Sequence, residues 1–527
     1  MRTRSRAAWT AAFVLLGAAV VARNVIALST VPPGLYVDEA SIGYNAWALA
    51  HHGVDEHGYS WPLYFEAFGE YKNPVYVYAL VPFARLMPLT ATTERLPAAL
   101  FGLVTVLFVT LMAWRVTRSR WAAVFACVIA AVTPWLVQES RVGFEVISMV
   151  ATLSICLWLL SDEQRLDHRR FALAGLFLAL SIFAYSTGRL LVVLFSAAFA
   201  VAYARRRFRG WWVAPTVVVA AYAGLGVWAV LHQGALTAEF NARSIAHDGA
   251  PLATLAGRFV SNYISYFSVD FLFLHGDANL RHNTGYAGML LAVTLPLLLL
   301  GLAGCWRRRR EALPKFLILC LVVGPVAAAL VDNGGAPHAL RSAAMLPFWL
   351  LLMVFGLDTA RAFVRRHSAR AALAALLAAG IALQTVPYLL DMYTAYPVRA
   401  ASWFDTGLPS AIAAGWYAAH GREVFISDTF EAGAAYIDAD FALLPAPPAT
   451  PHPTAGAPQM QALRISVTDP RTIALTARPG DVAVLAPADP VPGGAVLLHT
   501  EYAPGDPLQP QARPQAQVVV YRVPPSA

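Results

Sequence analysis

The sequence predicts a polytopic α-helical membrane protein with about 11 transmembrane helices and a small extracytoplasmic α/β or β-rich C-terminal domain. The chain of 527 residues is 58% apolar and only 13% charged, and its apolar runs have the length, about 20 residues, that crosses a bilayer. Its arginines cluster in short runs between those apolar stretches. From about residue 400, short β-like runs alternate with linkers rich in Pro, Ala and Gly.

The first apolar run, residues 7–28, follows a basic N-terminus and is long for the core of a cleaved signal peptide, so we interpret it as a signal anchor. The apolar segment 74–89 contains only about 16 residues, three prolines and an arginine, which is typical of an interfacial or re-entrant helix. The further predicted spans are 96–114, 121–137, 143–160, 171–186, 189–204, 212–231, 285–304, 314–331, 340–357 and 371–390.

The positive-inside rule supports leaving the segment 74–89 out of the membrane, because every arginine run then lies on one side. The N-terminus is therefore predicted to be cytoplasmic. The outer face receives the loop 30–94, the segment 138–145, the turn 185–189, the loop 232–284, the segment 332–341 and everything after about residue 391. We accordingly divide the chain into a transmembrane domain, residues 1–392, and an extracytoplasmic domain, residues 393–527.

The net charge of +8 comes from these short arginine runs, which indicates cytoplasmic loops and not nucleic-acid binding. The four cysteines, Cys127, Cys156, Cys305 and Cys320, lie in or at the end of apolar runs and form no CxxC motif. This pattern predicts packing residues, with neither a disulfide framework nor a metal site.

Polar residues gather in the predicted outer segments, where charge at membrane depth is expensive and usually functional. Directly after the first span, Pro32, Pro33 and Gly34 break the helix, and Asp38 and Glu39 follow at the membrane surface. Carboxylates can deprotonate a hydroxyl, whereas Arg, Lys and His side chains can hold an anionic group. The outer polar residues are Asp38, Glu39, Glu70, Lys72, Glu139, Arg141, Glu145, Arg189, His275, Asp277, Arg281, His282, Asp332, His338 and Arg341.

Several of these residues also have a simpler interpretation. Arg141 and Arg189 could be interfacial residues that extend their charges toward water. His275 and His282 lie seven apart, which favours a solvated or hydrogen-bonded role over a metal site. His338 and Arg341, three apart on one helical face, favour anion binding.

The loop with Asp38-Glu39 resembles the first outer loop of membrane glycosyltransferases of the C-type fold. It is similar in particular to bacterial relatives of the dolichyl-phosphate-mannose protein mannosyltransferases and of the lipid A aminoarabinose transferase. The segment 70–76, EYKNPVY, resembles their acidic-Lys-Pro-Pro motif, although Tyr71 separates acid from lysine and Asn73 replaces the first proline. Residues 94–97, ERLP, resemble the Arg-Leu-Pro start of the family's next span. The resemblance covers about residues 10–390.

This resemblance implies an enzyme of the bacterial cytoplasmic membrane that takes a monosaccharide from a polyprenyl-phosphate sugar. It would transfer the sugar, a hexose or a pentose, to a hydroxyl of a lipid, glycan or protein acceptor on the outer face. Asp38 would be the general base, with Glu39 or Glu145 positioning it, and Lys72 would hold the donor phosphate. The candidate substrate-binding residues are Lys72, Glu70, Arg141, Arg189, His275, His282, His338 and Arg341. A divalent metal is compatible with this fold, but the sequence offers no ligand set for one.

Two alternatives belong to other classes of protein. A transporter or flippase of lipid-linked sugars would place functional charges near the bilayer midplane and show repeat symmetry, whereas spans such as 143–160 and 371–390 are almost free of charge. A non-enzymatic envelope assembly protein would have no use for the outer acidic and basic cluster.

Overall fold

The computed structural model describes residues 2–205, 208–332, 335–364, 366–430, 434–454, 456–505, 507, 511 and 513–524. Parts of the predicted segments, namely Met1, Arg206, Arg207, Arg365 and residues 525–527, lie outside the described residues. The chain forms two compact units. Unit 1 comprises Met1–Ile26, Ala98–Arg141 and Glu145–Leu389, and unit 2 comprises Ala27–Pro97, Val142–Phe144 and Leu390–Ala527.

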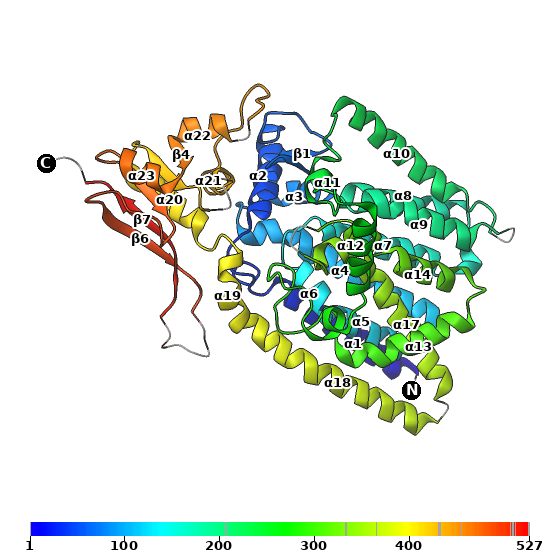
Figure 1. The fold of residues 1–527 in the computed structure, drawn as a ribbon. Coiled ribbons are helices and arrows are strands. Elements are labelled where there is room, and N and C mark those ends of the chain that lie inside the picture. The colour runs from blue at the N-terminus through cyan, green and yellow to red at the C-terminus, as the bar shows by residue number, and fades with distance from the viewer. Residues whose placement is uncertain are drawn as a thin grey trace. The chain divides into compact units, whose positions relative to one another are not determined.

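Unit 1 is helical (Figure 1). Helix α8 lies beside α7, α9 and α10, and α13 packs along α17. The longer helices are α1 (Arg2–Val25), α4 (Ala91–Thr117, whose first turns belong to unit 2), α5 (Arg120–Val132), α7 (Val146–Leu160), α8 (His168–Ala184), α9 (Gly188–Tyr203), α10 (Val213–Leu231), α12 (Leu252–Ser265), α13 (Leu295–Arg307), α14 (Ala312–Val323), α17 (Leu346–Phe363) and α18 (His367–Tyr393). Shorter helices are α6 (Pro134–Glu139), α11 (Ala238–Arg243), α15 (Val326–Ala329) and α16 (Ala339–Ser342).

Each of the predicted spans coincides with at least one helix, but not every helix could cross a membrane alone. Among the described residues, five helical stretches are long and apolar enough to do so by length and composition. They are Ala91–Thr117, Val213–Leu231, Ala312–Ala329, Ala339–Phe363 and His367–Tyr393. The helical class of the fold is confirmed, whereas the count of 11 membrane crossings remains a prediction.

Proline shortens one predicted span for a simple reason. The span predicted over 121–137 ends at Val132, and α6 begins at Pro134. Proline has no N–H to continue the preceding helix and is favoured in the first turn of a new one. Glu139 and Arg141 consequently lie in and after the short helix α6, and α7 begins beyond them at Val146.

Helix α3 (Pro74–Leu86) corresponds to the segment predicted to stay out of the membrane. It has 13 residues and contains Pro82. At 1.5 Å per residue such a helix is about 20 Å long, shorter than the roughly 30 Å hydrocarbon core. Its length therefore fits an interfacial or re-entrant helix.

The C-terminal part of unit 2 contains a five-stranded mixed sheet in the order β4-β3-β5-β7-β6. Strand β3 (Val424–Ser427) pairs in parallel with β4 (Ile465–Thr468) and β5 (Val482–Leu485). Strand β7 (Ala516–Arg522) pairs antiparallel with β5 and with β6 (Val496–Tyr502). The helices in this part of unit 2 are α19 (Ala395–Ala400), α20 (Leu408–Ala419), α21 (Tyr436–Leu443), α22 (Ala457–Leu463) and α23 (Pro470–Thr476). The β-like runs predicted from the sequence are thus strands of an α/β arrangement.

The central strands β3 and β5 are buried on both faces of the sheet, because successive side chains of a strand point to opposite faces. Val424 and Ile426 lie in one core with Leu408 and Ile412 of α20. Phe425, between them in β3, lies in a second core with Ile473 of α23. Helices therefore cover the two faces of the sheet, which is typical of parallel strands that join through helices.

Helix α2 (Val37–His52), which carries the predicted catalytic acids, shares a core with α21 of the C-terminal part of unit 2 (Figure 1). Tyr44 lies in this core with Phe441, and its hydroxyl donates to the carbonyl of Pro445 at 2.8 Å. A Cβ at Gly43 would lie 2.7 Å from the Phe441 ring, so only glycine fits there. The first predicted outer loop and the C-terminal sheet region thus belong to one packed body.

A buried glutamate adds polar contacts to this connection. The side-chain carboxylate of Glu56 accepts from Asn45 Nδ2 of α2 at 3.1 Å. The backbone carbonyl of Glu56 accepts from Gln459 Nε2 of α22 at 2.8 Å. The Tyr436 hydroxyl of α21 lies 3.5 Å from the second oxygen of Glu56. Burial raises the pKa of Glu56 to about 8, so the network is neutral at pH 7.

Candidate functional site

The helix with the two predicted catalytic acids begins just after the Pro-Pro-Gly break. Tyr36 occupies the N-cap position, and Glu39 in the first turn accepts the Tyr36 backbone N–H at 3.0 Å. Carboxylates in the first turn are also favoured by the positive end of the helix dipole. Consecutive helical residues point about 100° apart, which places Asp38 and Glu39 in different surroundings.

Glu39 is fully buried and forms an ion pair with Arg95 of α4. Arg95 Nε lies 2.7 Å from one carboxylate oxygen and Nη2 lies 2.9 Å from the other, a bidentate arrangement. The same guanidinium donates to the carbonyls of Leu28, Pro32 and Gly34. Arg95 therefore fixes both α2 and the chain that leads into it, and Glu39 is a positioning residue in this geometry.

A second fully buried carboxylate, Glu94, lies beside this pair. The backbone N–H of Gly143 donates to Glu39 Oε1 at 2.8 Å. A Cβ on Gly143 would overlap the Glu94 carboxylate, so the site requires glycine at this position. The segment Val142–Phe144 thereby closes the buried side of α2 within unit 2.

Lys72 reaches the site from a tight hairpin of β1 (Phe65–Ala67) and β2 (Glu70–Lys72). Phe68 and Gly69 between the strands have positive φ of 54° and 76°, the backbone that a two-residue type I′ turn requires. Because strand side chains alternate, Glu70 and Lys72 share one face and Tyr71 takes the other. Tyr71 separates the acid from the lysine along the chain, unlike in the family motif. The side chains of Glu70 and Lys72 nevertheless lie next to each other.

The ammonium of Lys72 bridges two half-buried acids, Asp38 and Glu70. Its Nζ lies 2.6 Å from Asp38 Oδ1 and 2.6 Å from Glu70 Oε1. The Lys72 side chain is 7% exposed and the Asp38 side chain 28%, so Asp38 is the member of the Asp-Glu pair that solvent or substrate can reach. We call Asp38, Glu70 and Lys72 the loop triad. Two carboxylates and one ammonium give it a net negative charge.

Unit 1 holds a separate buried cluster of two imidazoles and a carboxylate. His282 Nδ1 lies 3.0 Å from Asp277 Oδ2, His338 Nδ1 lies 4.0 Å from the same oxygen, and the two imidazole centres are 4.5 Å apart. The potential ligand atoms of Asp277, His282 and His338 all lie within 4.8 Å of one another. We call them the imidazole cluster. Two nitrogen ligands and one oxygen ligand match the donors of zinc sites with an open position.

The protonation states of Asp277 and His338 in the imidazole cluster favour the binding of a cation. Burial acts to raise the pKa of Asp277, but its hydrogen bond to His282, the charges of both imidazoles and the N–H of Asn279 lower it to about 2. Burial first, then the influence of His282 and Arg341, lowers the pKa of His338 to about 2. Near pH 7 the carboxylate is therefore charged and His338 keeps a free electron pair for a metal.

Unpaired buried atoms at the cluster support the same interpretation. Nδ1 of His338 and both carboxylate oxygens of Glu139 are buried and make no hydrogen bond within the described part of the chain. Burial, and next the negative charge of Asp277, raises the pKa of Glu139 well above its usual range. Gln138, next to Glu139, donates to the Arg281 carbonyl at 2.9 Å, which joins α6 to the loop with the cluster.

The remaining predicted site residues of unit 1 contact the backbone or lie outside the imidazole cluster. Arg141 is fully buried and donates to the carbonyls of Arg23, Asn24 and Ile26 at the C-terminal end of α1, where it satisfies unpaired carbonyls. Arg189 lies in the first turn of α9 and donates to the Leu236 carbonyl at 3.1 Å. His275 is 78% exposed and pairs with Asp270.

Glu145 and Arg341 adjoin helix starts in unit 1. Glu145 is buried at the N-cap of α7, where its carbonyl accepts from the Ser148 backbone and hydroxyl. Arg341 lies in α16, three residues after His338, whose pKa its charge helps to lower. Glu145 lies close in sequence to Arg141, and Arg341 lies close to His338. Neither Glu145 nor Arg341 belongs to the imidazole cluster.

The structure adds three residues to those selected from the sequence. Arg95 neutralises Glu39, and Asp277 and Glu139 complete the surroundings of His282 and His338. The sequence signal for Arg95 was its place in the ERLP segment. For Asp277 and Glu139 it was their place among the outer polar residues, without any spacing that pointed to a ligand set.

The fold and the two clusters can be compared with those of known proteins. No family model matches the chain, and no curated protein matches it in sequence. Among solved structures, the chain is similar to ArnT from Cupriavidus metallidurans in the apo state, with 13% identity, 98% of each chain covered and a TM-score of 0.55. It is also similar to the same ArnT bound to undecaprenyl phosphate, with 14% identity, 97% of this chain and 98% of that chain covered and a TM-score of 0.56. At this identity the likeness shows the fold alone, and it confirms the predicted fold family.

Proposed function

We propose that the chain is a membrane glycosyltransferase that transfers a monosaccharide from a polyprenyl-phosphate sugar to an acceptor hydroxyl. The observation that carries the proposal is the loop triad, which sets a reachable carboxylate against a buried ammonium. The binding of undecaprenyl phosphate by ArnT, which has the same fold, supports a polyprenyl phosphate as the carrier. The acceptor is a lipid, glycan or protein.

In the proposed reaction the acceptor oxygen attacks the anomeric carbon, and the bond from that carbon to the phosphate oxygen breaks. Asp38 takes the acceptor's proton, and the polyprenyl phosphate leaves with the electron pair of the broken bond. Proton transfer neutralises Asp38 and so removes one of the two charges that hold Lys72. The ammonium then becomes available to the leaving phosphate, while Glu70 keeps the lysine in place.

Other residues have supporting roles in this proposal. Glu39 and Arg95 hold the start of α2, so that Asp38 meets the acceptor in a fixed direction. Arg341, Arg189 and the neutral His338 are proposed to contact the phosphate or the sugar. Arg141, which satisfies the end of α1, and the buried Glu145 are proposed to support the fold around them.

We further propose that the imidazole cluster binds a divalent metal. Asp277, His282 and His338 would be its ligands, with Glu139 close enough to interact electrostatically. A bound divalent cation would neutralise phosphate charge.

Metal content tests this proposal without an activity assay. We expect the purified protein to take up about one Zn²⁺ or Co²⁺ per chain, with Co²⁺ giving visible absorption. His282→Ala and His338→Ala should each weaken uptake by more than about 100-fold, because loss of even an outer partner of a ligand costs 10–100-fold. His275→Ala is the matched control, since His275 is exposed outside the cluster. Full uptake by the double variant His282→Ala/His338→Ala would refute the site.

The proposed location is the bacterial cytoplasmic membrane, with the N-terminus inside and residues 393–527 outside. Cysteines introduced at Ser60 and Thr90, two exposed positions on either side of α3, should both react with a membrane-impermeant maleimide on intact cells. The four native cysteines are buried, which keeps the background low. A cysteine at the exposed Arg309 should react only after permeabilisation. Labelling of Ser60 and Thr90 from opposite sides would refute the topology, because α3 would then cross the membrane.

A further inference from the structure

The C-terminal part of unit 2 has a groove that the proposed reaction does not use. It has a cavity volume of about 860 Å³ and lies at the amino ends of the three parallel strands β3, β4 and β5. The strand register aligns Val424 with Ile465 and with Val482, so the residues just before these positions meet at one edge of the sheet. The ends of α22 and α23 supply the remaining walls.

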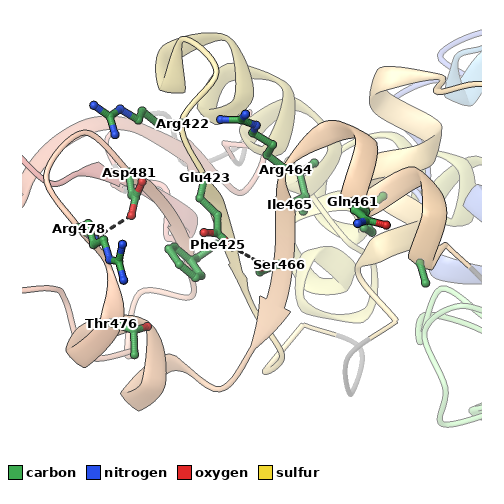
Figure 2. A pocket seen from close by; sticks show the side chains of 12 residues that line it. Arg422, Glu423, Phe425, Gln461, Arg464, Ile465, Ser466, Thr476, Arg478 and Asp481 are labelled. Carbon is green, nitrogen blue, oxygen red and sulfur yellow. Dashed lines mark hydrogen bonds between the residues drawn. The ribbon is translucent and has the colours of Figure 1, made fainter.

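Three arginines surround this groove, each from a different segment (Figure 2). They are Arg422 before β3, Arg464 before β4 and Arg478 before β5, and all three are exposed. Arg464 donates to the Gly421 carbonyl at 2.8 Å. Within the described residues, the guanidinium groups of Arg422 and Arg478 make no hydrogen bond or ion pair.

The two acids of the groove do not neutralise these arginines. Glu423 accepts from the Ser466 hydroxyl at 2.5 Å, and Asp481 accepts from the backbone N–H of Arg478 at 2.8 Å (Figure 2). Exposed arginines near carboxylates normally pair with them, whereas here the carboxylates have other partners. The groove therefore presents a net positive charge with two guanidinium groups available to a ligand.

The remaining lining is suited to a carbohydrate. Gln461, Ser466 and Thr476 offer amide and hydroxyl groups that match sugar hydroxyls. The volume lies within the usual range for a small-molecule site, about 300–1,000 Å³. Guanidinium groups pair in a bidentate manner with carboxylate and phosphate.

We propose that this groove binds an anionic carbohydrate, a glycan segment with a phosphate or carboxylate group. The inference rests on the proposed function, because such a segment would belong to the acceptor of the transferase. The groove then selects acceptors by charge, in the same packed body as α2 and Asp38.

Binding of defined probes to the full-length protein in nanodiscs tests the proposal, without donor lipid present. A tetramer of galacturonic acid serves as the carboxylate probe and mannose 6-phosphate as the phosphate probe. We expect at least one probe to bind, and binding to weaken as salt is raised. Arg422→Gln/Arg478→Gln should weaken it by about tenfold or more, because the variant removes two charge-assisted contacts to the anion.

The matched control is Arg471→Gln/Arg513→Gln, which removes the same charge from two exposed arginines outside the groove and should change affinity less than about twofold. Asp38→Asn should bind the probe as the natural sequence does, so a failure of the proposed chemistry would leave this test intact. No binding of either probe, or equal losses in the two double variants, would overturn the inference. Binding of only one probe identifies the anion.

Discussion

Replacement of Asp38 by Asn is expected to lower sugar transfer by about 10²–10⁴-fold, the usual contribution of a positioned general base. Asparagine keeps the size of aspartate and an oxygen that can accept from Lys72, but it cannot take the acceptor's proton. The side chain is partly exposed, so folding and expression should change little. The measurement is turnover of the purified protein with a polyprenyl-phosphate-sugar donor, together with donor affinity, which should stay nearly unchanged.

Lys72→Ala provides the contrasting result, because it removes the charge proposed to receive the phosphate. Donor affinity should fall together with turnover. Tyr71→Phe is the matched control on the opposite face of the same strand, where the Tyr71 hydroxyl lies 3.4 Å from Glu66. Near-normal turnover of Asp38→Asn would remove Asp38 from the mechanism and make Glu145 the next candidate base, because Glu39 is fully paired with Arg95.

Arg95→Leu is expected to produce the largest loss of stability, about 3–5 kcal/mol, because it leaves the buried Glu39 carboxylate without its counter-ion. It also leaves the carbonyls of Leu28, Pro32 and Gly34 without their donor. The measurement is thermal unfolding of the detergent-solubilised protein, which should begin several degrees lower.

The double variant Glu39→Leu/Arg95→Leu distinguishes two causes of lost stability: a buried charge without a counter-ion, and a change in the shape of the packed side chains. Removal of both charges should recover part of the stability, since an apolar pair carries no uncompensated charge. Arg85→Leu is the matched control, because Arg85 is exposed on α3. A double variant less stable than Arg95→Leu would show that the shape of the two side chains, and not their charge balance, holds this part of unit 2 together.

The loop triad could be predicted from the sequence because its members are close along the chain and carry a family motif. Glu70 and Lys72 are two residues apart, and strand alternation brings them to one face. The imidazole cluster could not be predicted in this way. His338 is 61 residues from Asp277, and only the folded helices of unit 1 bring them together. The spacing of His275 and His282 indicates only a solvated or hydrogen-bonded role, and it gives no sign that His282 lies beside Asp277 and His338.

The strands of the C-terminal sheet also differ in how well the sequence predicts them. Strands β3, β4, β5 and β7 could be predicted because their buried sides impose β-branched and apolar residues. Strand β6 could not, since its residues are mostly exposed and include His499 and Glu501. Its place in the sheet is specified by pairing with β7, and a local sequence carries little trace of such pairing.

The core that α2 shares with α21 also determines when during synthesis unit 2 can first become complete. Tyr44 and its hydrogen-bond partner Pro445 are separated by 401 residues. At about 5–20 residues per second, the ribosome needs roughly 20–80 s between making one and making the other. During that interval α2 carries Asp38 without its final packing partner. A newly made chain therefore gains a fixed position for Asp38, the proposed general base, only near the end of its own translation.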